Sequence, residues 1–248
     1  MANRQRAEAR RKAQAKAART TSEGSSGSSS QFKIWLALGL VLVLGVGIAI
    51  FVSRSDDSKA TSDSSNTTDA VSSIPDTQPV TVSGEPLVPF DAKTSPDPAV
   101  GAAAPLLSGL NFAGQALAID PAANGPYMLV FLAHWCPHCN AEVPRLNDWK
   151  HTGAVPPELN VVGVATAVSP TNVNYPPGSW FSNMGWEWPV IVDESQGDGV
   201  AGKAAQAFGA SGWPYFVIIG ADGKVKVRVS GEVEASELGT IVATALAA

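Results

Sequence analysis

The sequence is poor in cysteine, histidine and charge, and each shortage excludes a class of protein. It has only 2 cysteines and 3 histidines among 248 residues, and charged residues make up 16%. Two cysteines form at most one intramolecular bridge, which excludes a disulfide scaffold. Only one apolar run is long enough to cross a bilayer, which excludes a protein with several membrane spans. With 45% hydrophobic residues, the chain is still too apolar to be disordered throughout.

The net charge of −5 is unevenly distributed. Residues 1–33 contain eight Lys and Arg and two Glu, a balance of +6, whereas residues 34–248 contain the other nine basic and twenty acidic residues, a balance of −11. A basic segment directly before an apolar run is typical of a topology signal in a membrane protein. We therefore predict a basic cytoplasmic tail over 1–33 and no nucleic-acid partner.

The apolar run covers residues 34–52, nineteen residues without a charged side chain. As a helix it would span roughly 28 Å, close to the hydrocarbon thickness of a bilayer. A cleaved signal peptide has a shorter apolar core and a small-residue cleavage site, and SRSDDSKATS, which follows residue 52, contains no such site. The prediction is a retained, single-pass transmembrane helix over 34–52. Because excess Lys and Arg stay inside, everything after it is expected to be extracytoplasmic.

The part after the predicted span divides into two regions. Residues 53–98 are rich in Ser, Thr, Asp and Pro, which predicts a flexible linker that buries too little apolar surface to fold. Within it, residues 86–100 are a candidate extension packed on the following domain. Residues 99–248 are predicted to be one folded domain.

The predicted domain alternates between strand-like and helix-like segments. Strands are expected over 106–112, 115–119, 127–134, 159–167, 188–192, 215–220 and 225–230, and helices over 137–149, 200–208 and 234–246. The pair Asp222-Gly223 predicts a hairpin turn. This order predicts an α/β fold in which a central mixed sheet is flanked by helices on both faces.

Both cysteines lie where a buried strand gives way to a helix, in Trp135-Cys136-Pro137-His138-Cys139. The i, i+3 spacing places the two sulfurs on one helix face, close enough to bridge. The helix N-terminus favours the thiolate form of Cys136, and a protonated His138 would add to this. Cys136 is expected to be accessible, whereas Cys139, one turn further on, is expected to be more buried and to keep a higher pKa. This asymmetry is what thiol–disulfide exchange requires.

Three other interpretations of the domain are weaker: a structural disulfide, a metal site and an interaction module. A structural bridge that closes so small a ring would add little stability. A metal site usually needs a second, distant pair of ligands, whereas the candidates are mostly clustered: Cys136, Cys139, His134, His138 and His151. An interaction module could use an exposed aromatic surface formed by Trp180, Phe181, Trp186 and Trp188, although core packing is the default for such residues.

Residues 99–248 resemble the thioredoxin superfamily, and in particular its membrane-anchored, extracytoplasmic TlpA-like branch. The resemblance rests on Phe131–Cys139, FLAHWCPHC, on Glu142 and Pro144 in the following helix, on Gly212–Ile218, GWPYFVI, and on the ADGK turn at 221–224. It implies a thioredoxin-like fold and a redox-active dithiol that needs no organic cofactor and no metal.

The resemblance also implies roles for residues outside the dithiol. Pro214 is expected to be cis and, with Trp213, to dock an extended substrate peptide beside the cysteines. Val130 stands where thioredoxins proper have a buried aspartate that assists proton transfer. Glu142 is the candidate to replace that aspartate, the alternative being a solvated helix residue. Residues 172–183 look like an insertion before the strand at 188–192.

The direction of electron flow is left open by these residues. Pro137-His138 matches the dipeptide of strongly oxidising bacterial disulfide oxidases, and a stabilised thiolate makes the disulfide a better oxidant. The resemblance to the TlpA-like branch implies instead a reductase, for example of apocytochrome thiols during haem attachment. The remaining alternative is a copper- or metal-binding chaperone of the same superfold. Pro137, His138 and Trp135 are the residues expected to tune the redox potential.

We therefore predict a membrane-anchored, extracytoplasmic thiol–disulfide oxidoreductase with a preference for dithiol oxidation. Cys136 is expected to exchange with thiol- or disulfide-containing proteins, and Cys139 to resolve the mixed disulfide. A membrane redox partner would recycle the pair.

Overall fold

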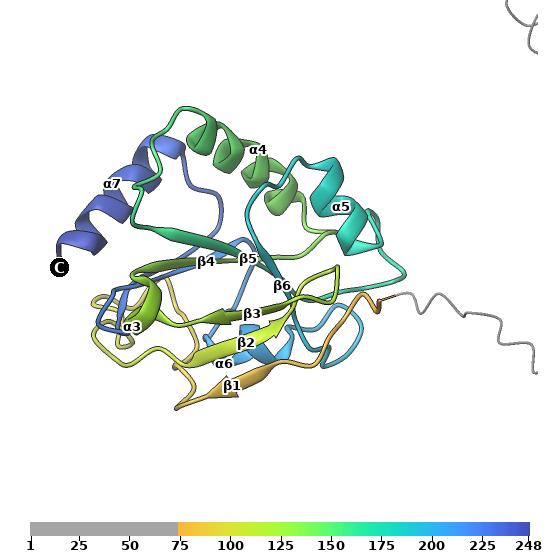
Figure 1. Cartoon of the computed structure of the whole chain (residues 1–248), viewed down its shortest axis with the longest axis horizontal. Coiled ribbons are helices and arrows are strands. Elements are labelled where there is room, and N and C mark those ends of the chain that lie inside the picture. Colours follow the sequence, from red (N-terminus) through yellow and green to blue (C-terminus); the bar gives the residue numbers. More distant parts are fainter. Residues whose placement is uncertain (1–73) are drawn as a thin grey trace, which may run out of the picture. The chain divides into compact units, whose positions relative to one another are not determined.

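The computed structural model describes residues 74–248, and Figure 1 labels most of its elements. In chain order they are β1 (Thr81–Ser83), β2 (Leu106–Leu110), β3 (Ala116–Ile119), α3 (Pro121–Asn124), β4 (Tyr127–Leu132), α4 (Pro137–His151), β5 (Asn160–Ala165), α5 (Pro177–Asn183), β6 (Val190–Val192), α6 (Lys203–Ala207), β7 (Tyr215–Ile219), β8 (Val225–Ser230) and α7 (Ala235–Ala247). Every predicted strand and helix is present, most of them one to three residues shorter at an end.

The central sheet has five strands in the order β6-β5-β4-β7-β8. β4, β5 and β6 run parallel, whereas β7 is antiparallel to both β4 and β8. The sheet is therefore mixed, as predicted. All six residues of its middle strand, β4, are buried, because neighbouring strands and layers on both faces cover them.

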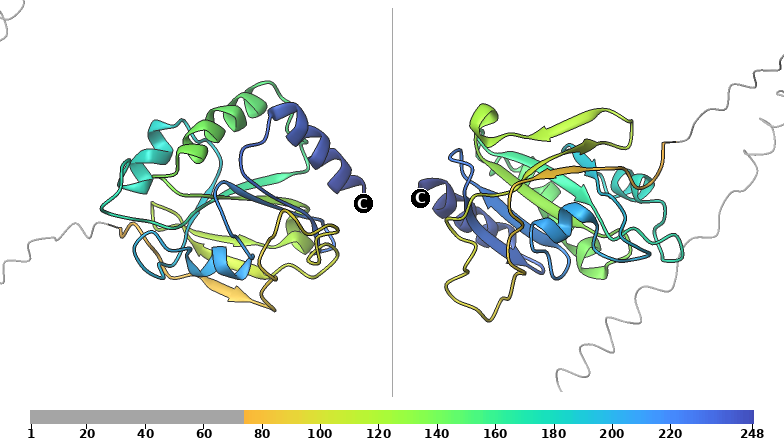
Figure 2. Two further views of the ribbon diagram at one scale, coloured as in Figure 1. Left: turned by 180° about the vertical axis from the view of Figure 1, so that it is seen from behind. Right: turned by 90° about the horizontal axis from the view of Figure 1, so that it is seen from below.

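The two faces of the sheet carry different layers. Helices α4, α5 and α7 cover one face, while α6 and a separate sheet of order β1-β2-β3 lie on the other (Figures 1 and 2). Each face of the sheet has its own hydrophobic core, and alternate residues of β4 pack into them. Met128 and Val130 belong to the core on the α4 side, and Leu129 and Phe131 to the core on the α6 side. This is the two-residue period of a strand buried on both faces. Coverage of both faces was predicted, but the small second sheet was not.

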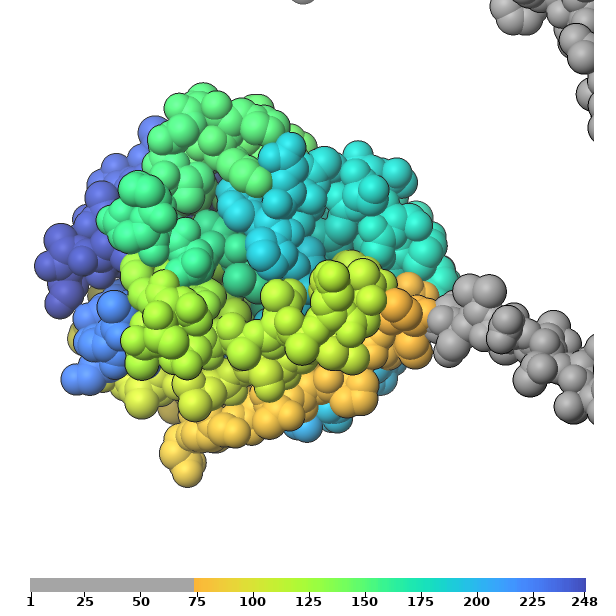
Figure 3. All heavy atoms as spheres, viewed as in Figure 1, coloured from red at the N-terminus to blue at the C-terminus, as the bar shows by residue number. Residues whose placement is uncertain are grey.

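Part of the segment predicted to be a linker is packed on the domain. Val80 and Leu87 are 4% and 6% exposed, and β1 pairs antiparallel with β2. In Figure 3 the chain from residue 74 (orange) lies along the strands β2 and β3 (yellow-green). The prediction of a flexible linker is therefore corrected for residues 74–85, whereas the candidate extension at 86–100 packs on the domain as expected, with Leu87 and Ala99 buried. The average composition of the segment is polar, so it did not predict that its few apolar residues, such as Val80 and Leu87, are buried against the domain.

A buried ion pair holds the end of this extension. All three guanidinium nitrogens of Arg228 on β8 donate hydrogen bonds: Nε to Asp97 Oδ2 at 2.8 Å, Nη2 to Asp97 Oδ1, and Nη1 to the carbonyl of Val88 at 2.7 Å. The Arg228 guanidinium holds the pKa of Asp97 below its usual range. The extension is thus secured by polar contacts to a strand far away in sequence.

Within residues 74–248, no helix combines the length and the apolar character that crossing a membrane demands. The predicted tail at 1–33, the predicted span at 34–52 and the linker up to residue 73 lie outside the described residues.

The aromatic residues of 180–188 belong to the core. Trp180 and Phe181 on α5 are each 4% exposed, and the Phe181 ring lies 5.7 Å from that of Trp186. Trp186 in turn stacks against Trp188 at 4.9 Å and covers Gly163 of β5. Core packing, the default interpretation, is confirmed for Trp180 and Phe181, and Trp186 and Trp188 are partly buried and pack against the same core.

Candidate active site

The two cysteines lie at the start of α4, directly after the central strand β4. Cys136 is the N-cap residue with an extended backbone (φ −73°, ψ 122°), and Pro137 occupies the first helical turn. Proline suits this position because the first amides of a helix have no partner inside the helix. The Cys136 carbonyl accepts from the Asn140 amide at 3.1 Å and from Asn140 Nδ2 at 2.8 Å, which fixes the start of the helix.

The two thiols differ less in exposure than expected. Cys136 is 5% exposed and Cys139 is fully buried, and both are present as free thiols. The order of burial is as predicted, but the expectation of an openly accessible Cys136 is corrected. The loop that contains Trp213 packs against it, so that Cys136 Sγ lies 3.5 Å from the Trp213 carbonyl oxygen.

The acidities of the two thiols are strongly different. Hydrogen bonding from the Cys139 thiol, together with the amides of Cys139 and His138 and the charge of His138, lowers the pKa of Cys136 to about 6. Burial, above all, raises the pKa of Cys139 far above that of an ordinary thiol. At neutral pH Cys136 is therefore mainly a thiolate and Cys139 a thiol. The Cys139 thiol lowers the pKa of Cys136 more than the amides at the start of the helix do.

The loop before β7 faces the dithiol. The Trp213–Pro214 peptide is cis, as the resemblance predicts. The Pro214 carbonyl accepts from the Gly231 amide at 2.8 Å, which ties this loop to the end of β8. Trp213 is half-buried and packs against both cores, and its carbonyl oxygen is the atom that lies 3.5 Å from Cys136 Sγ.

Glu142 lies one turn after Cys139 and is fully buried, not solvated. Its Oε2 accepts from the Val233 amide at 3.0 Å and from Arg145 Nη1 at 3.4 Å. Within residues 74–248 its Oε1 has no hydrogen-bond partner. Burial raises the pKa of Glu142. A buried carboxyl group with a raised pKa holds its proton more firmly than an exposed one and is a candidate to exchange it with the Cys139 thiol one turn away. Val130, in the place of the thioredoxin aspartate, packs into the same core.

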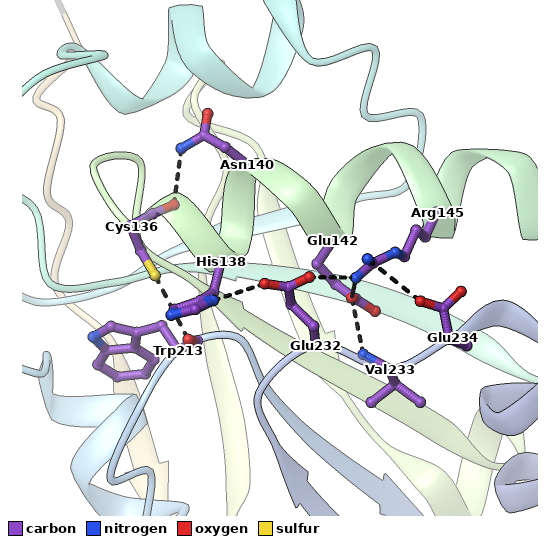
Figure 4. A network of polar contacts seen from close by, with 9 residues as sticks. All are labelled: Cys136, His138, Asn140, Glu142, Arg145, Trp213, Glu232, Val233 and Glu234. Carbon is purple, nitrogen blue, oxygen red and sulfur yellow. Dashed lines mark hydrogen bonds and ion pairs between the residues drawn. The ribbon is translucent and has the colours of Figure 1, made fainter. Parts of the chain in front are cut away.

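His138 is exposed and pairs with a residue that no sequence pattern suggested. Its Nδ1 lies 2.7 Å from Glu232 Oε1, although the two residues are 94 positions apart. Glu232 Oε2 accepts from Arg145 Nη1 at 2.6 Å. Figure 4 shows the resulting chain of side chains, which runs beside the dithiol from His138 to Arg145 and the buried Glu142.

Trp135 and the loop around it are held by the segment between β5 and α5. Trp135 Nε1 donates to the Ala167 carbonyl at 2.7 Å. The Asn174 side chain donates to the His134 carbonyl at 3.0 Å, and Trp180 Nε1 donates to Asn140 Oδ1 at 2.9 Å. The predicted insertion therefore supports the active-site loop.

The candidate metal ligands do not converge in the described part of the chain. His134 is 1% exposed, its Nδ1 lies 2.9 Å from the Val173 carbonyl oxygen, and its Nε2 accepts from the Ser169 amide at 3.1 Å. His151 pairs with Glu187 at 3.4 Å. Among residues 74–248, no group of three His, Cys, Asp or Glu side chains is arranged to hold a metal ion. The three histidines instead contact backbone groups or glutamates, and this arrangement does not favour the metal-chaperone alternative.

Several solved structures are similar to this chain. StoA from Bacillus subtilis is 18% identical over 58% of this chain and 99% of that one, with a TM-score of 0.45. A thiol:disulfide interchange protein of the thioredoxin family from Chlorobium tepidum is 25% identical over 58% and 94%, with a TM-score of 0.46. A secreted Mycobacterium tuberculosis disulfide oxidoreductase is 23% identical over 55% and 93%, with a TM-score of 0.43.

No curated protein matches the sequence. The model of the AhpC/TSA family, however, matches residues 100–228, which is more than half of the chain. The matched region contains β4, the dithiol, the cis-proline loop and most of β8. With its mixed sheet, its flanking helices and its paired cysteines, the chain belongs to the AhpC/TSA family.

Proposed function

We propose that this protein oxidises dithiols of extracytoplasmic proteins while tethered to the cell membrane. The observation that supports this most is the asymmetry of the dithiol. One thiol has a pKa lowered to about 6, while burial raises the pKa of the other. A stabilised Cys136 thiolate favours the reduced form of the protein, which makes its disulfide a stronger oxidant.

The reaction proceeds by two exchanges. A substrate thiolate attacks Cys136 Sγ of the disulfide form, so that the Cys136–Cys139 bond breaks and a substrate–Cys136 bond forms. The second substrate thiolate then attacks the substrate sulfur of this mixed disulfide and releases Cys136 as a thiolate. Two electrons pass from the substrate dithiol to the protein. Cys139 takes up a proton on leaving, and Glu142 is the buried acid next to it.

The cis-proline loop is the proposed docking site for substrate. The Trp213 carbonyl already lies 3.5 Å from Cys136 Sγ, and β7 behind it is fully buried and rigidly paired on both edges. An extended peptide that pairs with this loop would bring its cysteine to the sulfur of Cys136. Because Cys136 is only 5% exposed, close docking is required for attack.

Membrane attachment is proposed from the sequence. The nineteen-residue apolar run at 34–52, preceded by eight basic residues, supports a single span with the catalytic domain outside the cytoplasm. Disulfide formation is consistent with that compartment, because reductants keep thiols reduced in the cytosol. A membrane partner would then reoxidise the dithiol after each turnover.

Equilibration of the full-length protein with glutathione buffers tests the proposal. Strongly oxidising dithiols have potentials near −120 mV and thioredoxin-like reductants near −270 mV, about 30 mV for each 1.4 kcal/mol. We expect a value closer to the first, measured from the fraction of thiols that can be alkylated. A value near the second would replace the oxidase by the reductase that the TlpA-like resemblance implies. Failure to exchange with glutathione, with the Cys136→Ser variant as blank, would contradict both.

A further inference from the structure

The loop between β8 and α7 places a carboxylate beside the dithiol. Glu232 contacts His138 Nδ1 at 2.7 Å through one oxygen and Arg145 Nη1 at 2.6 Å through the other. The side chain of Glu232 is 31% exposed and that of His138 is 65% exposed, so the pair sits at the rim of the site and not in the core. Neither residue type nor spacing linked these positions in the sequence.

The backbone on both sides of Glu232 is fixed. The Gly231 amide donates to the Pro214 carbonyl at 2.8 Å, and the Val233 amide donates to the buried carboxylate of Glu142 at 3.0 Å. Gly231 has a φ of 98°, a conformation that favours glycine and turns the chain immediately after β8. Glu232 is thus held between the cis-proline loop and α4, and Figure 4 shows its carboxylate directed at the His138 ring.

The charges around His138 come from three places. Cys136 contributes a thiolate from the same helix terminus, Glu232 a carboxylate from the facing loop, and Arg145 a guanidinium behind that carboxylate. Hydrogen bonding to Glu232 is the main cause that raises the pKa of His138. The charge of His138, in turn, helps to lower the pKa of Cys136.

We propose that Glu232 is a positioning residue that keeps the His138 imidazole protonated and oriented at the rim of the dithiol, and thereby sets how oxidising the Cys136–Cys139 disulfide is. The proposal rests on the proposed exchange function and adds to it a residue that touches neither sulfur. Glu232 lies in contact with both His138 and Arg145. Without its carboxylate, the positive charge of Arg145 would no longer be compensated, and this would further disfavour protonation of His138.

Replacing Glu232 with Gln in the full-length, detergent-solubilised protein tests this. The amide keeps the size of the side chain but removes its charge. We expect the titration midpoint of His138, followed by NMR of labelled histidine and assigned with His138→Asn, to fall. We also expect the midpoint of Cys136 alkylation to rise, and the equilibrium with glutathione to shift about two- to five-fold toward the disulfide form, the range of exposed ion pairs.

Two controls separate this mechanism from others. Glu234 also pairs with Arg145, at 3.4 Å, but does not contact His138, so Glu234→Gln is expected to change none of the three readouts. In a His138→Asn background, Glu232→Gln is expected to have no further effect on Cys136. If the effect persisted there, the influence would run through Arg145 and Glu142, and the proposal would be wrong.

These measurements distinguish a failure of this proposal from a failure of the proposed function. If the wild-type protein exchanges with glutathione but Glu232→Gln leaves His138 and Cys136 titrating as before, the proposal for Glu232 fails while the oxidoreductase assignment stands. If the wild-type protein does not exchange at all, the proposed function fails, and the titration of His138 still reports whether Glu232 acts on the imidazole.

Discussion

Replacing Cys139 with Ala is expected to abolish turnover and to leave substrate trapped on Cys136 as a mixed disulfide. In the reverse of the proposed oxidation, which the reduced protein carries out on a disulfide, the Cys136 thiolate attacks that disulfide, and Cys139 then attacks Cys136 Sγ to release the reduced substrate. Removing the second sulfur stops the reaction after the first bond has formed. Mass spectrometry after incubation with oxidised glutathione should show one glutathione added per chain.

The matched variant is Cys136→Ala. It retains Cys139, whose thiol is fully buried and has a raised pKa. We therefore expect this variant neither to turn over nor to accumulate an adduct. Equal adduct formation by the two variants would show that Cys139 can attack substrates, which would reverse the roles assigned to the two thiols. Thermal unfolding of both variants, followed by circular dichroism, shows whether either loss results from unfolding.

The second large effect is expected for Glu142→Gln. This variant should slow the attack of Cys139 on the mixed disulfide by about 10²-fold, which is the lower end of the rate contribution of general acids and bases. The amide still accepts from the Val233 amide through its oxygen, so the local structure is retained. It cannot, however, exchange a proton with the buried Cys139 thiol. Rapid-mixing measurement of mixed-disulfide decay would give the rate of this step.

Stability distinguishes slower chemistry from damage to the fold. An acid whose pKa is raised by folding binds more protons in the folded state, so its contribution to stability is lost as the pH rises through that pKa. The neutral amide avoids this loss, and Glu142→Gln should be at least as stable as the wild type at neutral and higher pH. Asp148→Asn, at an exposed position of the same helix, is the control that should change neither rate nor stability. Unchanged decay in Glu142→Gln would remove Glu142 from the mechanism.

The parts of the site that lie close together in sequence were predictable. The i, i+3 cysteines after an apolar strand fix the dithiol at a helix start, because strand and helix patterns differ in their period. The cis state of Pro214 followed from the resemblance, which rests on a short motif around that residue. The hairpin turn at Asp222-Gly223 followed from turn chemistry alone, and the Gly223 amide donates to the Gly220 carbonyl at 2.9 Å there.

Polar contacts between distant segments were not predictable. Glu232 reaches His138 across 94 residues, and Asp97 reaches Arg228 across 131. Such pairs leave no periodic pattern in the sequence, since each partner on its own is an ordinary charged residue. The burial of Cys136 was missed for a related reason. It depends on how the loop around Trp213 packs over α4, which neither segment encodes alone.

The dependence of Cys136 alkylation on pH tests most directly the claim that the protein acts through an acidified thiol paired with a sheltered one. Iodoacetamide reacts with thiolates, and the raised pKa of the buried Cys139 leaves Cys136 as the reacting group. The rate is predicted to rise with a midpoint at about pH 6, with one modified cysteine per chain. A midpoint near 8.5, that of an ordinary cysteine, or equal modification of both cysteines would contradict this account.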